Sequence, residues 1–492
     1  MREPSLRSAK WMRFLGEEHD LDEVGWDNPA LALLWRYNQH YFDDLNAING
    51  AARRAWHEAL IERWRAENPP GRGTAYAPYP TSLRLVNWAK WFLGGAAPTP
   101  ATLDSLALQA RWLARRIEWH LRGNHLFVNA KALVFAGLFF EGLEAEGWLQ
   151  AGLAILAREL PEQVLADGGQ FERSPMYQAL ALEDLLDLLN LVQALAPPDS
   201  PARGLDGTLR ECSAAMLQWL RHMTHPGGAL VRFNDCAPGI APANAELDRY
   251  AAALGISAPL PAAQSVTRLE PSGYVRVACG PATAWLDLAP IGPDYLPGHA
   301  HADTLSFEVS LAERELIVNR GTSVYGTGPR RQIERGTAAH STVQIGAHDS
   351  SEVWSGFRVG RRARPGPVQI EDWQVQGSHD GYAHLPGRPQ HHRRWQFHAM
   401  GLIVEDKLDP PAREGAQARY HLAPGIELRA LGGQSWQMLE RGLPLARVDV
   451  QHGSAQVERW LHAERFGTLV DAQTLCIGLV GGSARVHWSW GP

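Results

Sequence analysis

The feature of this sequence that most constrains its fold is a change of hydrophobic period near residue 260. Before this point apolar residues recur every three or four positions, as in the run from Tyr177 to Ala196, which Pro197-Pro198 ends. After it, short runs alternate apolar and polar residues, a pattern typical of strands with one buried face. A single change of period predicts two domains, which we place at residues 1–260 and 261–492.

The first half is predicted to be helical from about residue 28 to residue 255. Besides the run that starts at Tyr177, helices are expected over residues 83–94, 101–120, 129–147, 149–160 and 205–223. Glycine and proline separate these helices at spacings that suit antiparallel helical hairpins. Consecutive hairpins without intervening strands indicate a bundle, a solenoid or an α/α toroid.

The second half is predicted to be an antiparallel β-sandwich. Strands are expected at residues 274–277, 284–288, 316–318, 402–406 and 484–488. Spacings of about 8–20 residues, with glycine and proline in the turns, are typical of a large antiparallel sandwich.

Composition excludes some classes of function. A net charge of −6 over 492 residues argues against a nucleic-acid-binding protein, which would need a basic face. It does not exclude an anionic substrate, because a local basic cleft can exist on an acidic molecule. The four cysteines lie far apart and are expected to be unpaired thiols. Some of the 19 tryptophans are expected in the core, and others suit flat platforms for sugar rings.

The N-terminal segment predicts a cytoplasmic protein. Residues 1–7 are not followed by the uninterrupted apolar stretch of a secretory signal, and no apolar run approaches the length of a membrane span. A chain from which a leader had been removed would look the same, and would be periplasmic or secreted.

The segment 298–307 carries the strongest sign of chemistry. It places His299, His301 and Asp303 at alternate positions just before an apolar run that starts at Leu305, which predicts a strand. On an extended segment these three side chains project from the same side. So many polar groups at the start of a strand indicate catalysis or binding, whereas the alternative is a solvated loop rich in histidine.

The helical half supplies further polar candidates. Asn124 and His125 precede the helix predicted to begin near residue 129, where a helix N-terminus can meet a carboxylate or where Asn124 only caps the helix. Tyr177 ends a polar loop at the start of a helix, a place where a lone tyrosine is more often a packed amphipathic side chain. Arg84 and Asn87 lie one helical turn apart, although a structural ion pair or cap explains Arg84 as well.

Taken together, these motifs resemble the heparinase II/III-like polysaccharide lyases along nearly the whole chain. In chain order the matching segments are residues 35–42, Ser82-Leu83-Arg84 with Asn87-Trp88, Asn124-His125, residues 172–177, His299 with His301, residues 319–322 and the segment around His340. The resemblance implies an α+β multidomain protein: an incomplete α/α toroid, then an antiparallel β-sandwich, with the active site between them.

The resemblance also implies roles for four residues in the elimination of a uronate-containing glycan. This reaction removes the C5 proton and expels the O4 oxygen, so it needs a group that neutralises the carboxylate, a base and an acid. The family pattern assigns the neutralising role to Asn124, and the acid role to Tyr177, which serves as both acid and base in a syn elimination. His125 would be the base for the other C5 epimer. His299 would bind the carboxylate or polarise Tyr177.

The resemblance places an anionic polysaccharide against a second set of residues. Arg84, Asn87, Glu172 and Arg173 are the expected substrate-binding residues. The basic run at residues 357–364 either lines the same cleft or protects a solvated strand edge.

Members of this group can carry a structural zinc ion in the sandwich half. The positions that match its ligands are His301, Asn319 and His340. Two histidines and a carboxylate would be a credible zinc set, but Asn319 is a poor zinc ligand. We therefore expect no required cofactor and weak or absent zinc.

Two other classes of function fit parts of this sequence. A glycoside hydrolase on a helical toroid would use a carboxylate pair such as Glu172 and Asp235, but would leave the tyrosine, histidine and asparagine candidates without a role. A glycan-binding or polymer-assembly protein would keep the fold without turnover. Only elimination creates a conjugated C4–C5 double bond, so ultraviolet absorbance separates the lyase from both alternatives.

Overall fold

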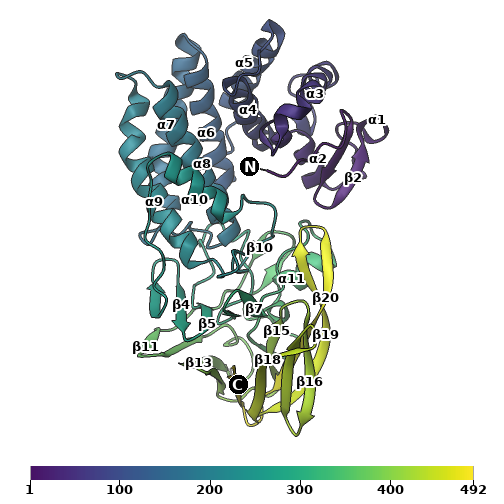
Figure 1. Ribbon diagram of the computed structural model, residues 1–492, viewed down its shortest axis with the longest axis vertical. Helices are drawn as coiled ribbons and strands as arrows, with labels where there is room; N and C mark the ends of the chain where they lie inside the picture. Colours follow the sequence, from purple (N-terminus) through teal and green to yellow (C-terminus); the bar gives the residue numbers. More distant parts are fainter. Residues whose placement is uncertain (1, 491–492) are drawn as a thin grey trace. The chain divides into compact units, whose positions relative to one another are not determined.

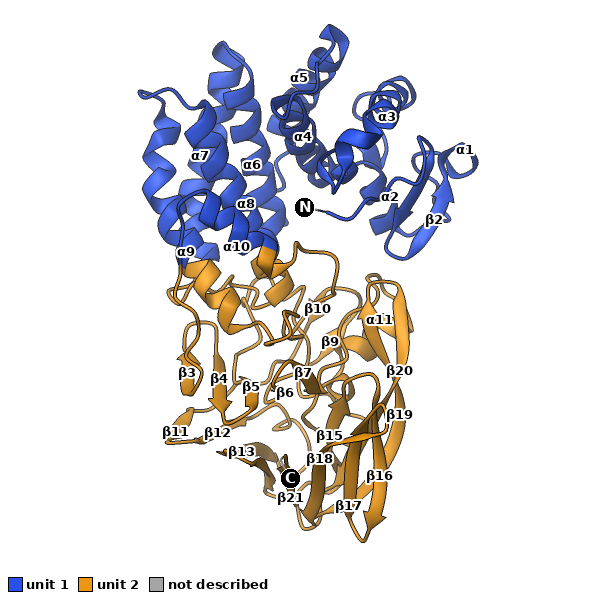
Figure 2. Cartoon of the chain, viewed as in Figure 1, with its two compact units in different colours: residues 1–164, 180–214, 246–257 blue, residues 165–179, 215–245, 258–492 orange. Residues whose placement is uncertain are grey.

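The computed structural model describes residues 2–490 and divides into two compact units (Figure 2). Unit 1 comprises residues 1–164, 180–214 and 246–257, and unit 2 comprises residues 165–179, 215–245 and 258–492. The two units alternate along the chain between residues 165 and 257, whereas the sequence pattern predicts one boundary near residue 260. That single boundary stays a prediction.

The helices follow one another along the first half of the chain (Figure 1). They are α1 (Leu21–Val24), α2 (Leu33–Gln39), α3 (Arg54–Glu67), α4 (Pro78–Leu93), α5 (Pro100–Ala114), α6 (Gly123–Phe139), α7 (Leu143–Gln163), α8 (Pro175–Leu195), α9 (Asp206–His222) and α10 (Asn244–Ala253). In unit 1, α6 packs against both α4 and α7. The predicted succession of helices is confirmed. An N-terminal hairpin, β1 (Trp11–Phe14) and β2 (Glu17–Asp20), was not predicted.

Helix starts follow local chemistry. Proline occupies the first turn of α4, α5 and α8, where a missing backbone N–H costs nothing. Thr99 and Thr102 form a capping box at α5. The expectation that α6 begins near residue 129 is wrong, because the helix starts at Gly123 and has buried residues around most of its circumference. An amphipathic period therefore does not mark its first turn.

Unit 2 is built on two antiparallel sheets. The nine-stranded sheet has the order β19-β20-β15-β7-β6-β5-β4-β3, with β8 paired to β15, and the eight-stranded sheet has the order β11-β12-β13-β14-β21-β18-β17-β16. The first contains β3 (Ser265–Leu269), β4 (Tyr274–Cys279), β5 (Ala282–Asp287), β6 (Phe307–Leu311), β7 (Arg314–Val318), β8 (Val343–Ile345), β15 (Ala416–Leu422), β19 (Ser454–Arg465) and β20 (Thr468–Gly478). The second contains β11 (Gln369–Glu371), β12 (Gln374–His379), β13 (Gln390–His398), β14 (Gly401–Asp409), β16 (Ile426–Gly432), β17 (Ser435–Glu440), β18 (Leu443–His452) and β21 (Ser483–Ser489).

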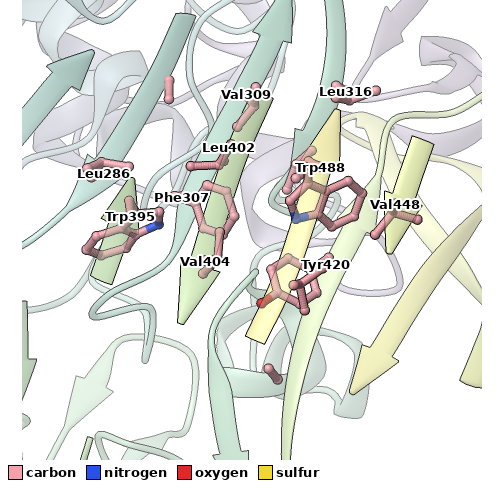
Figure 3. Packing of buried hydrophobic residues seen from close by; sticks show 14 of the residues in the cluster. Leu286, Phe307, Val309, Leu316, Trp395, Leu402, Val404, Tyr420, Val448 and Trp488 are labelled. Atoms are coloured by element: carbon pink, nitrogen blue, oxygen red, sulfur yellow. The ribbon is translucent and has the colours of Figure 1, made fainter. Parts of the chain in front are cut away.

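The two sheets enclose one hydrophobic core, which confirms the predicted sandwich. Burial alternates residue by residue along β13 and β21, as expected for strands with one face inward. Figure 3 shows aromatic side chains of the two sheets packed together. Phe307 lies 6.1 Å from Trp395 and Tyr420 lies 5.3 Å from Trp488, measured between ring centroids. Large aromatic rings each bury more apolar area than most other side chains, so these contacts stabilise the packing of the two sheets.

A buried ion pair connects the eight-stranded sheet to the polar segments of unit 2. The guanidinium of Arg393 binds Asp406 through Nε at 2.7 Å and Nη2 at 3.0 Å. Its Nη1 donates to the carbonyl oxygens of Leu305 at 2.9 Å and Ser341 at 2.6 Å. These two residues follow His299–Asp303 and His340 in the chain, so one arginine holds both segments against the core.

Two further expectations are tested by the fold. All four cysteines are free thiols, as predicted. Among residues 2–490, none of the helices combines the length and the apolar character needed to span a membrane.

Candidate functional site

A buried carboxylate, Asp235, organises the polar cluster of unit 2. Its two oxygens accept five hydrogen bonds: two from Arg331 and one each from His299, His301 and Thr322. Asp235 and Arg331 are completely buried. Burial by itself raises the pKa of Asp235, but the Arg331 guanidinium and the two imidazoles outweigh it and hold this pKa well below its usual range. Asp235 is therefore a permanent anion that orients its neighbours.

His299 lies between two carboxylates. Its Nδ1 is 2.9 Å from Asp235 Oδ2, and its Nε2 is 3.6 Å from Glu172 Oε2. The contact with Asp235 assigns the proton to Nδ1 and fixes the plane of the ring. The His299 side chain is 14% exposed, whereas that of His301 is 1% exposed. Of the two histidines on Asp235, His299 is thus the one that a ligand can reach.

Tyr177 stacks on the imidazole of His299. The two ring centroids are 4.0 Å apart and the ring planes differ by 32°. Tyr177 is the third residue of α8, and its backbone N–H donates to Ser174 Oγ at 3.2 Å, as in a helix N-cap. Its hydroxyl lies 3.1 Å from that of Tyr325. The predicted position of Tyr177 at a helix start is confirmed.

The loop before Tyr177 is held in an unusual conformation. Arg173 adopts a φ of 61°, in the left-handed region. Its carbonyl oxygen accepts hydrogen bonds from Tyr274 Oη at 2.7 Å and Asn234 Nδ2 at 3.1 Å, and its Nη1 donates to Pro290 O at 2.9 Å. These contacts place Glu172 beside His299. The structure therefore brings together three predicted site residues: Glu172, Tyr177 and His299.

His299 and His301 do not lie on a strand, contrary to the sequence-based expectation. The strand β6 begins at Phe307, and Leu305 has a φ of 64°. The two histidines nevertheless converge on Asp235. Asp303 instead accepts a hydrogen bond from the backbone N–H of Asn234 at 3.2 Å. Burial raises the pKa of Asp303 to about 6.

Asn124 and His125 lie in unit 1, in the first turn of α6. Both are half-buried. His125 Nδ1 is 3.2 Å from Glu118 Oε1, and its ring lies 4.5 Å from that of Tyr79, measured between centroids. The first backbone N–H groups of a helix have no partner within the helix, so this turn is suited to binding an anion. The catalytic roles of Asn124 and His125 stay predictions.

Arg84 and Asn87 also lie in unit 1, one turn apart on α4 as predicted. The Arg84 side chain is fully buried, and its guanidinium donates to Gln109 Oε1 at 2.7 Å and to Ala75 O at 2.8 Å. Asn87 Nδ2 donates to Tyr41 O at 2.8 Å. These contacts favour the structural interpretation of Arg84 over a contact with substrate, because its donors serve the protein itself.

The three residues that match a zinc site offer a poor ligand set, and the expected weak or absent zinc stays a prediction. His301 and His340 lie 5.2 Å apart between ring centroids, and both nitrogens of the buried His340 ring lack a hydrogen-bond partner among residues 2–490. Asn319 offers only a neutral amide, and its oxygen already accepts the backbone N–H of Ser341 at 3.1 Å. Among residues 2–490, no group of three or more His, Cys, Asp or Glu side chains is placed to hold a metal. Two imidazoles and an engaged amide do not suit Zn²⁺.

Two residues of this cluster, Arg331 and Tyr325, are absent from the sequence-based predictions, in which Asp235 appears only as half of a hydrolase pair. Arg331 lies on α11 (Pro329–Arg335), a helix that was not predicted. Burial, and then the charge of Asp235, raises the pKa of Tyr325 well above its usual value. Tyr325 therefore stays a neutral hydroxyl that can donate to Tyr177. No local pattern marks these residues, because they come together only in the folded unit.

Comparison with known proteins identifies the family. The model of the heparinase II/III N-terminus matches residues 61–251, and that of the heparinase II/III-like C-terminal domain matches residues 262–489. The chain belongs to the heparinase II/III-like family.

Two relatives of this heparinase II/III-like chain are heparin-sulfate lyases. The heparin-sulfate lyase of Bacteroides stercoris is 34% identical to this chain over 123 residues, which cover 24% of this chain and 18% of the lyase. The heparin-sulfate lyase of Pedobacter heparinus is 37% identical to this chain over 136 residues, which cover 25% of this chain and 20% of the lyase. The matched segments thus span about one fifth of each relative's length. A solved heparinase III structure has a TM-score of 0.71 at 16% identity, covering 97% of this chain and 79% of that one, which shows the shared fold.

Proposed function

We propose that this protein is a polysaccharide lyase that cleaves uronate-containing glycans by β-elimination and leaves a 4,5-unsaturated uronate at the new end. The observation that carries the proposal is the stack of Tyr177 on His299, an imidazole oriented by the buried carboxylate of Asp235. Membership of the heparinase II/III-like family and the two heparin-sulfate lyase relatives support the same reaction.

Tyr177 is suited to accept and return a proton at one atom. As a phenolate it takes the C5 proton; the C5–H electron pair forms the C4–C5 double bond, and the C4–O4 bond breaks. The phenol of Tyr177 then gives this proton to O4, so the side chain returns to the phenolate form in which it started. Tyr325 stabilises the phenolate, because its neutral hydroxyl can donate to the Tyr177 oxygen across 3.1 Å.

His299 provides the electrostatic support for this cycle. Asp235 holds the Nδ1–H group and Glu172 lies 3.6 Å from Nε2, so the imidazole is fixed in one orientation beside the reacting tyrosine. In the proposed mechanism Asn124 neutralises the uronate carboxylate by hydrogen bonding, without a titrating group. This role rests on the family resemblance.

The same contacts weigh against the hydrolase alternative. A glycosidase acid must hold a proton near neutral pH, which requires a raised carboxyl pKa. Asp235 has the opposite property, because five donors stabilise its ionised form. Its complete burial, with both oxygens engaged, also weighs against a role as the ionised carboxylate that must reach a sugar or a water molecule.

A polymer panel tests the proposed reaction. The protein is incubated with heparan sulfate, hyaluronan, alginate and bacterial exopolysaccharides, and ultraviolet absorbance and product masses are recorded. A lyase produces the conjugated double bond and fragments whose masses sum to that of the parent chain. Fragments whose masses sum to the parent chain plus one water molecule for each bond cleaved would indicate hydrolysis. Binding without new ends would indicate a glycan-binding protein. Either result would overturn the proposal, and Tyr177→Phe serves as the inactive control.

A further inference from the structure

The hairpin formed by β9 (Val353–Trp354) and β10 (Arg358–Val359) exposes two large aromatic side chains. Trp354 is 53% exposed and Phe357 is 41% exposed. By contrast, seven other tryptophans are almost completely buried. Neighbouring exposed aromatic rings on a soluble surface mark sites of interaction more often than isolated apolar residues do.

This hairpin is rigid because buried side chains bind its backbone. Arg331 Nε donates to Gly356 O at 3.0 Å, and Arg335 donates to the same oxygen at 3.2 Å and to Arg358 O at 3.3 Å. Both arginines are fully buried. A Cβ atom on Gly356 would lie 2.6 Å from Gly326 O, so the tip also packs closely against the chain behind it. The exposed rings are thus held in place before any ligand arrives.

The hairpin adjoins the reactive pair within the same unit. The Phe357 ring centroid lies 5.8 Å from that of His299 and 5.3 Å from that of Tyr325. A sugar ring on the exposed part of Phe357 would therefore be continuous with a sugar at Tyr177. Amphipathic pyranose rings stack on aromatic faces through their C–H groups.

Charge around the hairpin favours an anionic ligand. Residues 352–364 contain four arginines and one acidic residue, Glu352. Two of the arginines serve the protein: Arg361 binds backbone carbonyls and Arg362 pairs with Asp294 at 3.1 Å. Arg358 is exposed, and none of the described residues forms an ion pair with it. Its guanidinium is available to a carboxylate or sulfate group.

We propose that the β9–β10 hairpin is a glycan subsite, in which Trp354 and Phe357 stack against a sugar unit next to the cleaved bond and Arg358 binds an anionic group of that chain. The identity of the ligand as an anionic glycan rests on the proposed function. The occupant is a polysaccharide because the hairpin combines aromatic faces with a free cation and is continuous with the Tyr177–His299 pair.

Binding is measured on the full-length Tyr177→Phe chain, so that no cleavage disturbs the titration. Calorimetry uses octasaccharides of heparan sulfate and of hyaluronan, which separate sulfate from carboxylate recognition, and neutral dextran as the uncharged probe. Trp354→Ala and Phe357→Ala should each weaken binding roughly three- to tenfold. Arg358→Gln should weaken it at low salt, and the loss should shrink as salt is raised.

Matched controls come from the same unit. Trp373→Ala removes another tryptophan that is 37% exposed, and Arg413→Gln removes another exposed arginine. Both should bind like the parent chain. Equal losses in the controls, unchanged affinity in the hairpin variants, or no binding of either octasaccharide would overturn the subsite.

Failure of the subsite is distinguishable from failure of the proposed function. If the unmodified chain produces the ultraviolet signal but the hairpin variants bind normally, the lyase activity stands and the subsite is wrong. If the hairpin variants lose binding but the unmodified chain produces no unsaturated ends, the subsite stands and the proposed reaction is wrong. Preferential binding to dextran would contradict the anionic character of the ligand.

Discussion

Replacing Asp235 with asparagine tests the central arrangement of the site most directly. The substitution preserves shape but removes the negative charge that binds Arg331, His299 and His301. It also replaces one acceptor oxygen with an NH₂ group that faces hydrogen-bond donors. Because Asp235 and Arg331 are both fully buried, solvent cannot compensate for the lost charge.

The expected magnitude follows from the unpaired arginine. Removing one partner of a buried ion pair typically costs about 3–5 kcal/mol, because the other charge stays buried without compensation. We expect a loss of stability of this order in unit 2. Turnover should fall at least about 10²-fold, because His299 loses the acceptor that orients it.

A double-mutant cycle separates these two effects. Arg331→Met removes the unpaired charge, so adding it to Asp235→Asn should restore part of the stability but none of the turnover. Stability is measured by native-state hydrogen exchange of peptides from unit 2, since a chain with two compact units need not unfold in one step. Asp449→Asn, at the exposed pair with Arg447, is the control and should change stability by less than about 1 kcal/mol. Additive losses in the cycle, within about 0.5 kcal/mol, would refute the reasoning.

Four further outcomes are expected. Tyr177→Phe should keep the fold but lower turnover at least about 100-fold on the best polymer, and near-normal rates would remove Tyr177 from the mechanism. Asn124→Ala should lower kcat more than it raises KM, whereas a pure KM effect would show uniform binding. Burial raises the pKa of Asp44, but hydrogen bonds, led by that from His57, lower this pKa overall to about 2. The ionised Asp44 therefore stabilises the fold fully above the pKa that it has in the unfolded chain, and this stabilisation is lost as the pH falls. Asp44→Asn should thus flatten the fall of the urea midpoint between about pH 4 and pH 2. Elemental analysis should find little zinc in the native protein and more in Asn319→Asp, and stoichiometric zinc that survives a chelator would contradict this expectation.

Periodic features of the chain were predictable because they depend on neighbours in sequence. The run that starts at Tyr177 forms α8 within two residues of its predicted ends, and the strand predicted at residues 274–277 forms β4. Where burial is not periodic, the prediction was wrong, as at the start of α6, whose first turn carries Asn124. The hydrophobic pattern carries no signal when most of a helix is enclosed.

The candidate site was only partly predictable, for a different reason. Tyr177 and His299 stood out because polar residues clustered around them in the sequence. Asp235, Arg331 and Tyr325 lie in separate segments, and their importance arises from contacts between residues 64 to 148 positions apart. A single buried arginine or aspartate has no local sequence signature. Its role appears only when the fold shows what surrounds it.

The guanidinium of Arg331 has consequences for how this protein can change its specificity. Two of its nitrogens bind Asp235 and the third binds the carbonyl of Gly356, so the backbone of the β9–β10 hairpin and the reactive histidine share one rigid support. The ring of Phe357 packs on the same support, with its centroid 5.2 Å from the guanidinium carbon of Arg331 and 5.8 Å from the His299 ring centroid, whereas the Trp354 side chain is 53% exposed. In the proposed subsite, mutations at Trp354 can therefore alter which polymer is held without removing the ring that packs against His299. The proposed specificity of the exposed hairpin surface can thus change while the buried Asp235–Arg331 pair keeps its contacts.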